Sequence, residues 1–271
     1  MIKLIATDMD GTLLNDRKEV SEENKLALQK AIDAGVKVVL STGRPLFGVI
    51  PIFLNLGLKN QDDFVIVNNG CSVHSTKDWK LLDYVKLNES DITRLYNLVK
   101  DTDVQLVLTN ETTYYVVEEA PSETVIYDAS LTFQKPVVIS LEEACKEEYN
   151  MFQAMVMGKP DAIDQFENAN RENLAKDYSV VRSQTYIFEV LPQGTSKASA
   201  LEKLATDLGI KADEILALGD GNNDIEMLEF AGYSVAMDNA GEAVKAVAKY
   251  KTESNNEHGV AKAIERFIFK K

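Results

Sequence analysis

The chain has 271 residues, of which 45% are hydrophobic and 27% are charged, and its formal net charge is −14. This balance is typical of a globular protein with one large or two modest domains. The acidic charge argues against nucleic acid or an anionic membrane as the main partner. No apolar run approaches the roughly 18 residues that cross a bilayer, and the apolar stretch at the N-terminus is too short for a signal peptide. We therefore expect a cytoplasmic protein.

The two cysteines are Cys71 and Cys145, and the two histidines are His74 and His258. So few cysteines favour free thiols over a disulfide framework. The histidines lack the spacing of metal ligands, which argues against a histidine-based zinc site. No heptad pattern or large apolar face indicates an oligomeric state.

The first part of the chain alternates short β-rich runs with a helical pattern. The expected strands cover residues 2–7, 36–40 and 64–67. The stretch SEENKLALQKAIDAG (21–35) predicts a helix, with Ser21 as its N-cap and Gly35 as its C-terminal stop.

The middle of the chain has strands that follow one another closely. VQLVLT (104–109) and TYYVVE (113–118) predict a hairpin across the turn NET. A strand at 150–157, a polar helix at 161–178 and paired strands at 179–184 and 186–192 follow. Strands joined this tightly are antiparallel, with helices on one side. We therefore predict an α+β domain over residues 84–190.

The alternating pattern resumes near residue 195. A helix there carries Leu201, Leu204, Ala205 and Leu208 on one face and ends at Gly209. Strands at 215–219 and 233–237 alternate with further helices. The pattern predicts an α/β fold, a doubly wound parallel-sheet core made of residues 1–83 and 191–271, into which the α+β domain is inserted.

Polar residues stand at the expected carboxyl ends of the core strands, where open parallel sheets bind ligands. They are Asp8 and Asp10; Ser41, Thr42, Gly43 and Arg44; Lys197; and Asp220, Asn223 and Asp224. Each segment alone is typical of a turn or a helix cap. Four of them at one sheet edge indicate a site.

The charges of these segments point to phosphoryl transfer. Four aspartates in one cleft are tolerable around a hard cation such as Mg²⁺, which prefers carboxylates, water and phosphate oxygens. Lys197 would face the positive end of a helix dipole, and a bound anion would reverse that unfavourable sign. STGRP (41–45) offers hydroxyls and amides that cradle phosphate oxygens.

The spacing of Asp8 and Asp10 suits such chemistry. A carboxylate can act as nucleophile and form an aspartyl-phosphate. A second acid can protonate the leaving oxygen and later activate water. Because residues i and i+2 of an extended segment point the same way, Asp8 and Asp10 could address one phosphorus atom, while Gly11 lets the backbone turn away.

These motifs resemble those of the haloacid dehalogenase-like phosphatases, in particular the Cof-type branch. DMDGT (8–12), STGR (41–44), Lys197 in GTSKASAL and GDGNND (219–224) follow the order of the four family motifs. The likeness covers nearly the whole chain, and the insert looks like the family's C2-type cap. The resemblance implies Asp8 as nucleophile and Asp10 as general acid and base. It implies Mg²⁺ held by the Asp8 carboxylate, the Asp10 backbone carbonyl and Asp220.

The resemblance also implies the groups that hold the phosphate or the substrate. They are Ser41, Thr42, Gly43, Arg44, Lys197 and Asn223, with Gly11, Thr12, Asp224 and Asn69 in supporting roles. Asp224 would either hold the water shell of the metal or orient Lys197. Asn69 would face the substrate or simply form an Asn-Gly turn. Arg44 would reach the substrate across the domain interface or pair with a carboxylate of the cap.

The expected function is a Mg²⁺-dependent phosphatase for small phosphorylated metabolites, with sugar phosphates as the favoured class. Two alternatives remain: a phosphohexomutase-like phosphotransferase, and a phosphometabolite sensor without turnover. Tyr114, Tyr115, Tyr127, Phe133 and residues 151–157 could line a pocket of the cap. Such aromatic and methionine stripes in strands are more often core.

Overall fold

The computed structural model describes residues 1–58 and 62–270. The chain forms two compact units. The first comprises Met1–Thr42, Ile52–Asp83 and Ser196–Lys271, and the second comprises Gly43–Pro51 and Tyr84–Thr195. The insertion of one domain over 84–190 stays a prediction. The second unit also takes in residues 43–51 and 191–195.

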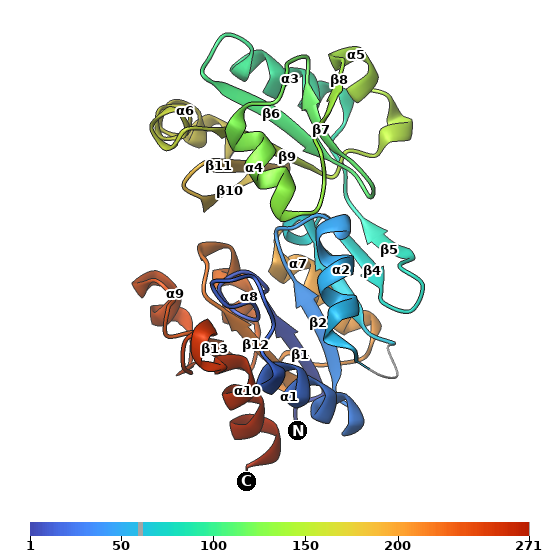
Figure 1. Cartoon of the computed structure of the whole chain (residues 1–271), viewed down its shortest axis with the longest axis vertical. Coiled ribbons are helices and arrows are strands. Elements are labelled where there is room, and N and C mark those ends of the chain that lie inside the picture. Colours follow the sequence, from blue (N-terminus) through green and yellow to red (C-terminus); the bar gives the residue numbers. More distant parts are fainter. Residues whose placement is uncertain (59–61, 271) are drawn as a thin grey trace. The chain divides into compact units, whose positions relative to one another are not determined.

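The first unit is built on a sheet of eight strands (Figure 1). The strands are β1 (Leu4–Thr7), β2 (Lys37–Ser41), β3 (Phe64–Val67), β4 (Ser72–Ser75), β5 (Leu81–Tyr84), β12 (Ile215–Gly219), β13 (Tyr233–Ala236) and β14 (Tyr250–Lys251). Their order is β14-β13-β12-β1-β2-β3-β4-β5. Pairing from β14 to β3 is parallel, whereas β4 runs antiparallel to β3. The predicted parallel-sheet core is confirmed, and β4 and β5 are additions that were not predicted.

Helices cover this sheet. They are α1 (Glu22–Asp33), α2 (Leu46–Leu56, which begins in the second unit), α7 (Lys197–Asp207), α8 (Ile225–Phe230), α9 (Glu242–Val247) and α10 (Gly259–Ile264), which continues as a π-helix over Glu265–Phe269. Ser21 caps α1 as predicted, because its side chain accepts a hydrogen bond from the Asn24 backbone N–H. Leu201 and Leu204 of α7 share a buried cluster with Leu4 of the central strand. That packing fixes the start of α7 against the end of the sheet strands. The predictions did not include α2, whose sequence has Pro51 in the middle.

The second unit has a six-stranded sheet in the order β10-β11-β9-β6-β7-β8. Its strands are β6 (Val104–Thr109), β7 (Tyr114–Val117), β8 (Val137–Ile139), β9 (Gln153–Gly158), β10 (Tyr178–Gln184) and β11 (Ile187–Pro192). Pairing is antiparallel except between β7 and β8. The predicted hairpin of β6 and β7 and the pairing of β10 with β11 are confirmed.

The helices of the second unit lie on both faces of its sheet. They are α3 (Glu89–Val99), α4 (Glu123–Leu131), α5 (Leu141–Ala144) and α6 (Pro160–Leu174). Leu106 of β6 faces the cluster that holds α3 and α6, whereas its neighbour Val107 packs with Val125 of α4. The prediction of helices on one side is therefore wrong. The helix predicted to residue 178 ends at Leu174, because Tyr178 begins β10.

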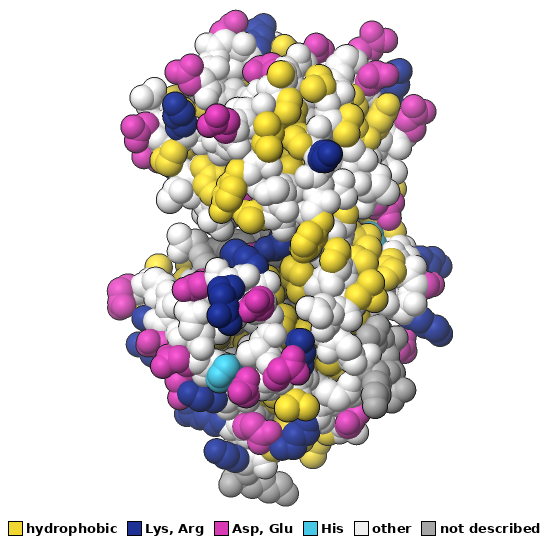
Figure 2. Space-filling model, viewed as in Figure 1, with side chains coloured by type: hydrophobic (Ala, Val, Ile, Leu, Met, Phe, Trp, Pro, Cys, Tyr) yellow, Lys and Arg dark blue, Asp and Glu magenta, His cyan; other side chains and the backbone are white. Residues whose placement is uncertain are grey.

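The aromatic and methionine side chains of this unit divide between core and surface. Tyr114, Met155 and Met157 are buried in the cluster beneath α4. Tyr127 and Phe133 are 57% and 59% exposed, and Figure 2 shows hydrophobic side chains on the visible face of this unit. Within residues 1–58 and 62–270, no helix combines the length and the apolar character needed to span a bilayer.

Candidate active site

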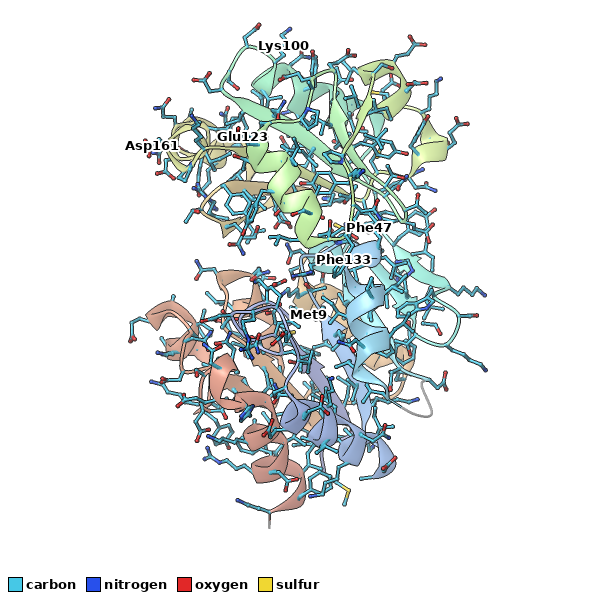
Figure 3. The ribbon with its side chains drawn as sticks, in the orientation of Figure 1. Met9, Phe47, Lys100, Glu123, Phe133 and Asp161 are labelled. Atoms are coloured by element: carbon cyan, nitrogen blue, oxygen red, sulfur yellow. The ribbon has the colours of Figure 1, made fainter. Side chains whose placement is uncertain are left out.

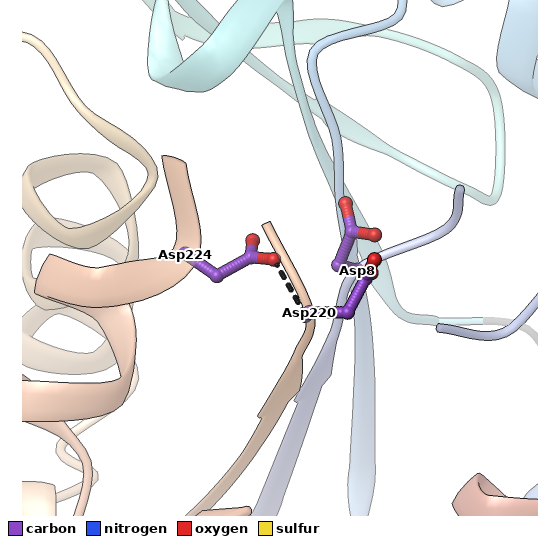
Figure 4. Close-up of side chains that lie close together, drawn as sticks. All are labelled: Asp8, Asp220 and Asp224. Atoms are coloured by element: carbon purple, nitrogen blue, oxygen red, sulfur yellow. Dashed lines mark hydrogen bonds between the residues drawn. The ribbon is translucent and has the colours of Figure 1, made fainter. Parts of the chain in front are cut away.

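The two central strands of the first unit deliver two aspartates to the same edge. β1 ends at Thr7, and the backbone N–H of Asp8 donates to the Leu218 carbonyl at 3.0 Å, which continues the pairing with β12. β12 ends at Gly219, so Asp220 follows directly. Parallel strands end at one edge of a sheet, so the carboxylates of Asp8 and Asp220 lie close together (Figure 4).

Asp224 completes a cluster of three carboxylates. One oxygen from each of Asp8, Asp220 and Asp224 lies within 4.8 Å of the others. Burial raises the pKa of Asp8 well above its ordinary value; Lys197 opposes this rise, and Asp224 and Asp220 add to it. Burial likewise raises the pKa of Asp220 to about 6. A divalent cation would attract the ionised carboxylates and so offset the burial and the mutual repulsion that raise the two pKa values. This set of oxygen donors therefore fits a divalent cation.

Lys197 lies against this cluster. The residue is 1% exposed, and its Nζ donates to Asp8 Oδ1 at 2.6 Å and to Asp224 Oδ1 at 2.7 Å. Burial alone would lower the pKa of Lys197, but the Asp224 and Asp8 carboxylates raise it. Lys197 therefore remains an ammonium that can bind an anion beside Asp8.

Both carboxylate oxygens of Asp224 accept hydrogen bonds from protein groups. Its Oδ1 accepts from Lys197, and its Oδ2 accepts from the backbone N–H groups of Asp220 at 3.0 Å and Gly221 at 2.9 Å. Figure 4 marks the bond between Asp220 and Asp224. This arrangement favours the interpretation of Asp224 as the residue that orients Lys197.

Gly11 and Thr12 pack against Asp220. A Cβ on Gly11 would lie 2.3 Å from Asp220 Oδ2, and Gly11 has φ +82°, so another side chain here would meet both a clash and backbone strain. The Thr12 hydroxyl donates to Asp220 Oδ1 at 2.7 Å. The loop after β1 therefore holds one of the candidate metal carboxylates.

A second group of polar residues follows β2 and β3. Thr42 is 1% exposed, and its carbonyl accepts from the backbone N–H of Asn69 at 3.0 Å. The Asn69 side chain accepts from Asn223 Nδ2 at 2.9 Å. Within the described chain, the buried Ser41 Oγ has no hydrogen-bond partner. The structure thus brings Thr42, Asn69 and Asn223 together.

Asn69 belongs to a strained turn. Asn68, Asn69 and Gly70 all have positive φ, at 53°, 52° and 100°. A Cβ on Gly70 would lie 2.2 Å from the carbonyl oxygen of Ser196. The turn therefore packs directly against the residue that caps α7 and precedes Lys197. The left-handed conformation costs glycine little, but at Asn68 and Asn69 it costs about 1–3 kcal/mol per residue and persists where the surroundings enforce it.

Asp10 has a different partner from Asp8. Its Oδ1 accepts from Lys18 Nζ at 2.8 Å, and its carboxylate is outside the cluster of Asp8, Asp220 and Asp224. Met9, which Figure 3 labels, lies between the two aspartates in the sequence and is fully buried. β1 ends at Thr7, so residues 8–10 lie outside the strand, and the shared direction of the Asp8 and Asp10 side chains stays a prediction.

Gly43 and Arg44 belong to the second unit. Arg44 is 9% exposed, and its Nη1 donates to the Leu131 carbonyl at 2.8 Å, at the end of α4. The roles of both residues in binding stay predictions.

Two contacts near the site involve residues that the motifs did not indicate. One is Lys18, which is bound to Asp10, and the other is Asn239. Asn239 follows β13 and donates from Nδ2 to the Gly11 carbonyl at 2.8 Å and to Asp220 Oδ2 at 3.4 Å. The rule that located Asp8 and Asp220 at strand ends applies equally to Asn239, so the sequence did hold that signal. Lys18 gave none, because its contact depends on a turn.

The haloacid dehalogenase-like hydrolase family model matches residues 5–264. The chain is 36% identical to YxeH of Bacillus subtilis (strain 168) over 271 residues, which is the full length of both. It is 33% identical to a 5-amino-6-(5-phospho-D-ribitylamino)uracil phosphatase, YcsE, of the same organism, over 98% of this chain and 96% of that protein. Among solved structures, the subclass IIB sugar phosphatase BT4131 superposes with a TM-score of 0.84 at 25% identity, covering 98% of each chain.

Proposed function

The chain belongs to the haloacid dehalogenase-like hydrolases and is a phosphoric monoester hydrolase of that family, and from this we propose a Mg²⁺-dependent phosphatase that acts on sugar phosphates through an aspartyl-phosphate. The observation that carries the proposal is the buried contact of Lys197 with both Asp8 and Asp224. An ammonium at this position balances the negative charge of the two carboxylates, and its third N–H group can donate to a phosphate oxygen.

Asp8 is the proposed nucleophile. One of its carboxylate oxygens attacks phosphorus, and the bond between phosphorus and the ester oxygen of the substrate breaks. Asp10 gives its proton to that ester oxygen, which leaves as an alcohol. Asp10 then takes a proton from water as the water attacks phosphorus, and the bond from phosphorus to Asp8 breaks. Inorganic phosphate is released and both aspartates are restored.

Asp10 must leave its contact with Lys18 to act in this way. The pair is partly exposed, with 46% of the Lys18 side chain and 26% of the Asp10 side chain accessible. An ion pair of this exposure is worth about 0–1 kcal/mol. Exchange of Lys18 for the ester oxygen of a bound substrate therefore costs little.

The proposed metal ligands are the carboxylates of Asp8 and Asp220 and the backbone carbonyl of Asp10. A bound Mg²⁺ would neutralise charge on the transferring phosphoryl group. The chain itself holds Asp220 for this purpose through Thr12. Lys197, Thr42, Gly43 and Asn223 are the proposed phosphate contacts, and Ser41, Arg44 and Asn69 are proposed to assist in binding the substrate.

Sugar phosphates are the proposed substrate class. Support comes from the sugar phosphatase BT4131, which shares the fold over nearly the whole chain. The relative YcsE is named for a substrate with a phosphorylated ribityl group, which is also a polyol phosphate. A cytoplasmic location stays a prediction from the sequence.

The test is phosphate release from a panel of hexose and pentose phosphates, 5-amino-6-(5-phospho-D-ribitylamino)uracil and p-nitrophenyl phosphate. Each compound is assayed with Mg²⁺, with chelator, and with Asp8→Asn. We expect release that requires both Mg²⁺ and Asp8, with sugar phosphates ranked first. Isomerised product with retained phosphate would instead establish a mutase, and binding without release would establish a sensor. Wild-type activity in Asp8→Asn would show that Asp8 is not the nucleophile.

A further inference from the structure

Asn239 joins the loop after β1 to the carboxylate of Asp220. From Nδ2 it donates to the Gly11 carbonyl at 2.8 Å and to Asp220 Oδ2 at 3.4 Å. Thr12 donates to the other oxygen, Asp220 Oδ1, at 2.7 Å. Both oxygens of Asp220 thus receive a hydrogen bond from outside its own segment.

Asn239 is itself held in place by Asn255. The backbone N–H of Asn255 donates to Asn239 Oδ1 at 3.0 Å, which leaves the amide nitrogen pointing toward Gly11 and Asp220. Asn255 is 5% exposed, and its Nδ2 donates to the Leu14 carbonyl at 3.0 Å and to Asp16 Oδ1 at 3.1 Å. Although Asn239 is exposed, its orientation is therefore held by a buried residue.

From these contacts we infer that Asn239 is a positioning residue for the metal carboxylate Asp220, acting together with Thr12. This inference rests on the proposed function, since it assigns a role at the same Mg²⁺ site. Partners of ligating carboxylates fix the direction of the ligand oxygen, and their loss typically lowers metal affinity roughly 10–100-fold. Asn239 also acts through Gly11, because it donates to the carbonyl of Gly11, whose backbone lies against Asp220.

The chain offers a matched control in Asn256. It is also an exposed asparagine that anchors the same loop, because its Nδ2 donates to Asp16 Oδ2 at 2.9 Å and its Oδ1 accepts from the Asp16 backbone N–H at 3.2 Å. These contacts reach neither Gly11 nor Asp220. Asn239→Ala and Asn256→Ala therefore separate the positioning of Asp220 from general anchoring of the loop.

The experiment measures Mg²⁺ binding to the chelator-treated full-length protein by isothermal titration calorimetry without substrate, together with the Tm of each metal-free variant. We expect Asn239→Ala to weaken Mg²⁺ binding about tenfold or more. Asn256→Ala should bind Mg²⁺ like the parent, and the metal-free Tm values of the two variants should be similar. Asn239→Ser, which also cannot reach Asp220, should repeat the result if Asn239→Ala does not fold.

Mg²⁺ affinity of Asn239→Ala within twofold of the parent would overturn the inference, and so would an equal loss in Asn256→Ala. Either result leaves the proposed function standing if the parent releases phosphate with Mg²⁺. A parent chain that neither binds Mg²⁺ nor requires it would overturn the proposed metal dependence itself.

Discussion

Lys197 Nζ lies 2.6 Å from Asp8 Oδ1, although the two residues are 189 positions apart in the chain. The lysine is also 2.7 Å from Asp224 Oδ1, and all three side chains are buried. A buried ion pair adds little net stability by itself, but removal of one partner leaves uncompensated charge. Lys197 therefore links the stability of the first unit to its chemistry.

Replacement of Lys197 by methionine should damage both properties. Loss of the ammonium leaves Asp8 and Asp224 unpaired, so we expect the metal-free protein to lose about 3–5 kcal/mol of unfolding free energy. Loss of a charged donor to the phosphoryl group should lower kcat by about 100-fold or more. Urea denaturation and p-nitrophenyl phosphate turnover measure the two effects.

The control for Lys197→Met is Lys203→Met on the same helix. Lys203 is 59% exposed and pairs with Asp83 at 2.6 Å. Because exposed ion pairs contribute about 0–1 kcal/mol to stability, Lys203→Met should lose at most about 1 kcal/mol of unfolding free energy. Its partner is Asp83 and not Asp8 or Asp224, so turnover should stay unchanged. Turnover by Lys197→Met at the parental rate would remove Lys197 from the mechanism.

Gly70→Ala tests the turn that packs against the start of α7. The new Cβ would lie 2.2 Å from the Ser196 carbonyl, at a backbone φ of +100°. We expect the clash and the strain to lower the unfolding free energy by about 3 kcal/mol or more. Gly35→Ala is the matched control, because Gly35 has φ +83° with no atom within 4 Å of a new Cβ. It should lose only the left-handed penalty of about 1–2 kcal/mol. Equal losses in the two variants would mean that the contact with Ser196 can relax.

His74 should make the stability depend on pH. It is 0% exposed, its Nε2 lies 3.2 Å from Ser72 Oγ, and burial lowers its pKa from 6.5 to about 4. Because the folded pKa lies below the unfolded one, the unfolded chain takes up the proton first as the pH falls. The contribution of neutral His74 to the unfolding free energy is therefore fully present above pH 6.5. It is lost as the pH falls toward 4, by about 3 kcal/mol in total.

Urea denaturation at a series of pH values, compared between the parent and His74→Gln, measures this loss. The difference in unfolding free energy between the two proteins should narrow as the pH falls. A constant difference across this range would show that His74 does not titrate on unfolding.

The site could be predicted to the extent that it depends on strand ends. The apolar runs that form β1, β2 and β12 could be recognised as buried strands from the sequence. The residues that follow parallel strands lie at the same edge of the sheet. In the structure Asp8, Thr42 and Asp220 follow these strands, and the carboxylates of Asp8 and Asp220 lie close together. Lys197 was recognisable because a cation at a helix start needs an anion nearby.

Contacts that depend on irregular backbone could not be predicted in this way. The pairing of Asp10 with Lys18 requires the left-handed conformation of Lys18, at φ 61°, within a turn that the Asn15 side chain holds. The position of α4 was also missed. Its buried apolar residues are Val125 and Ala129, but Ile126 and Tyr127 of the same helix are exposed, so the sequence shows no clear apolar face that predicts which side of the sheet the helix covers.

The order of the pieces along the chain has a consequence for synthesis. A ribosome that adds 5–20 residues per second makes Lys197 roughly 10–40 s after Asp8. By the end of that interval residues 84–195, which form most of the second unit, have been made, while most of α7 and all of β12 are still to be synthesised. We therefore expect the second unit to fold first on the nascent chain. The Asp8 carboxylate would stay hydrated until Lys197 emerges, so the candidate active site would be among the last parts of the protein to form.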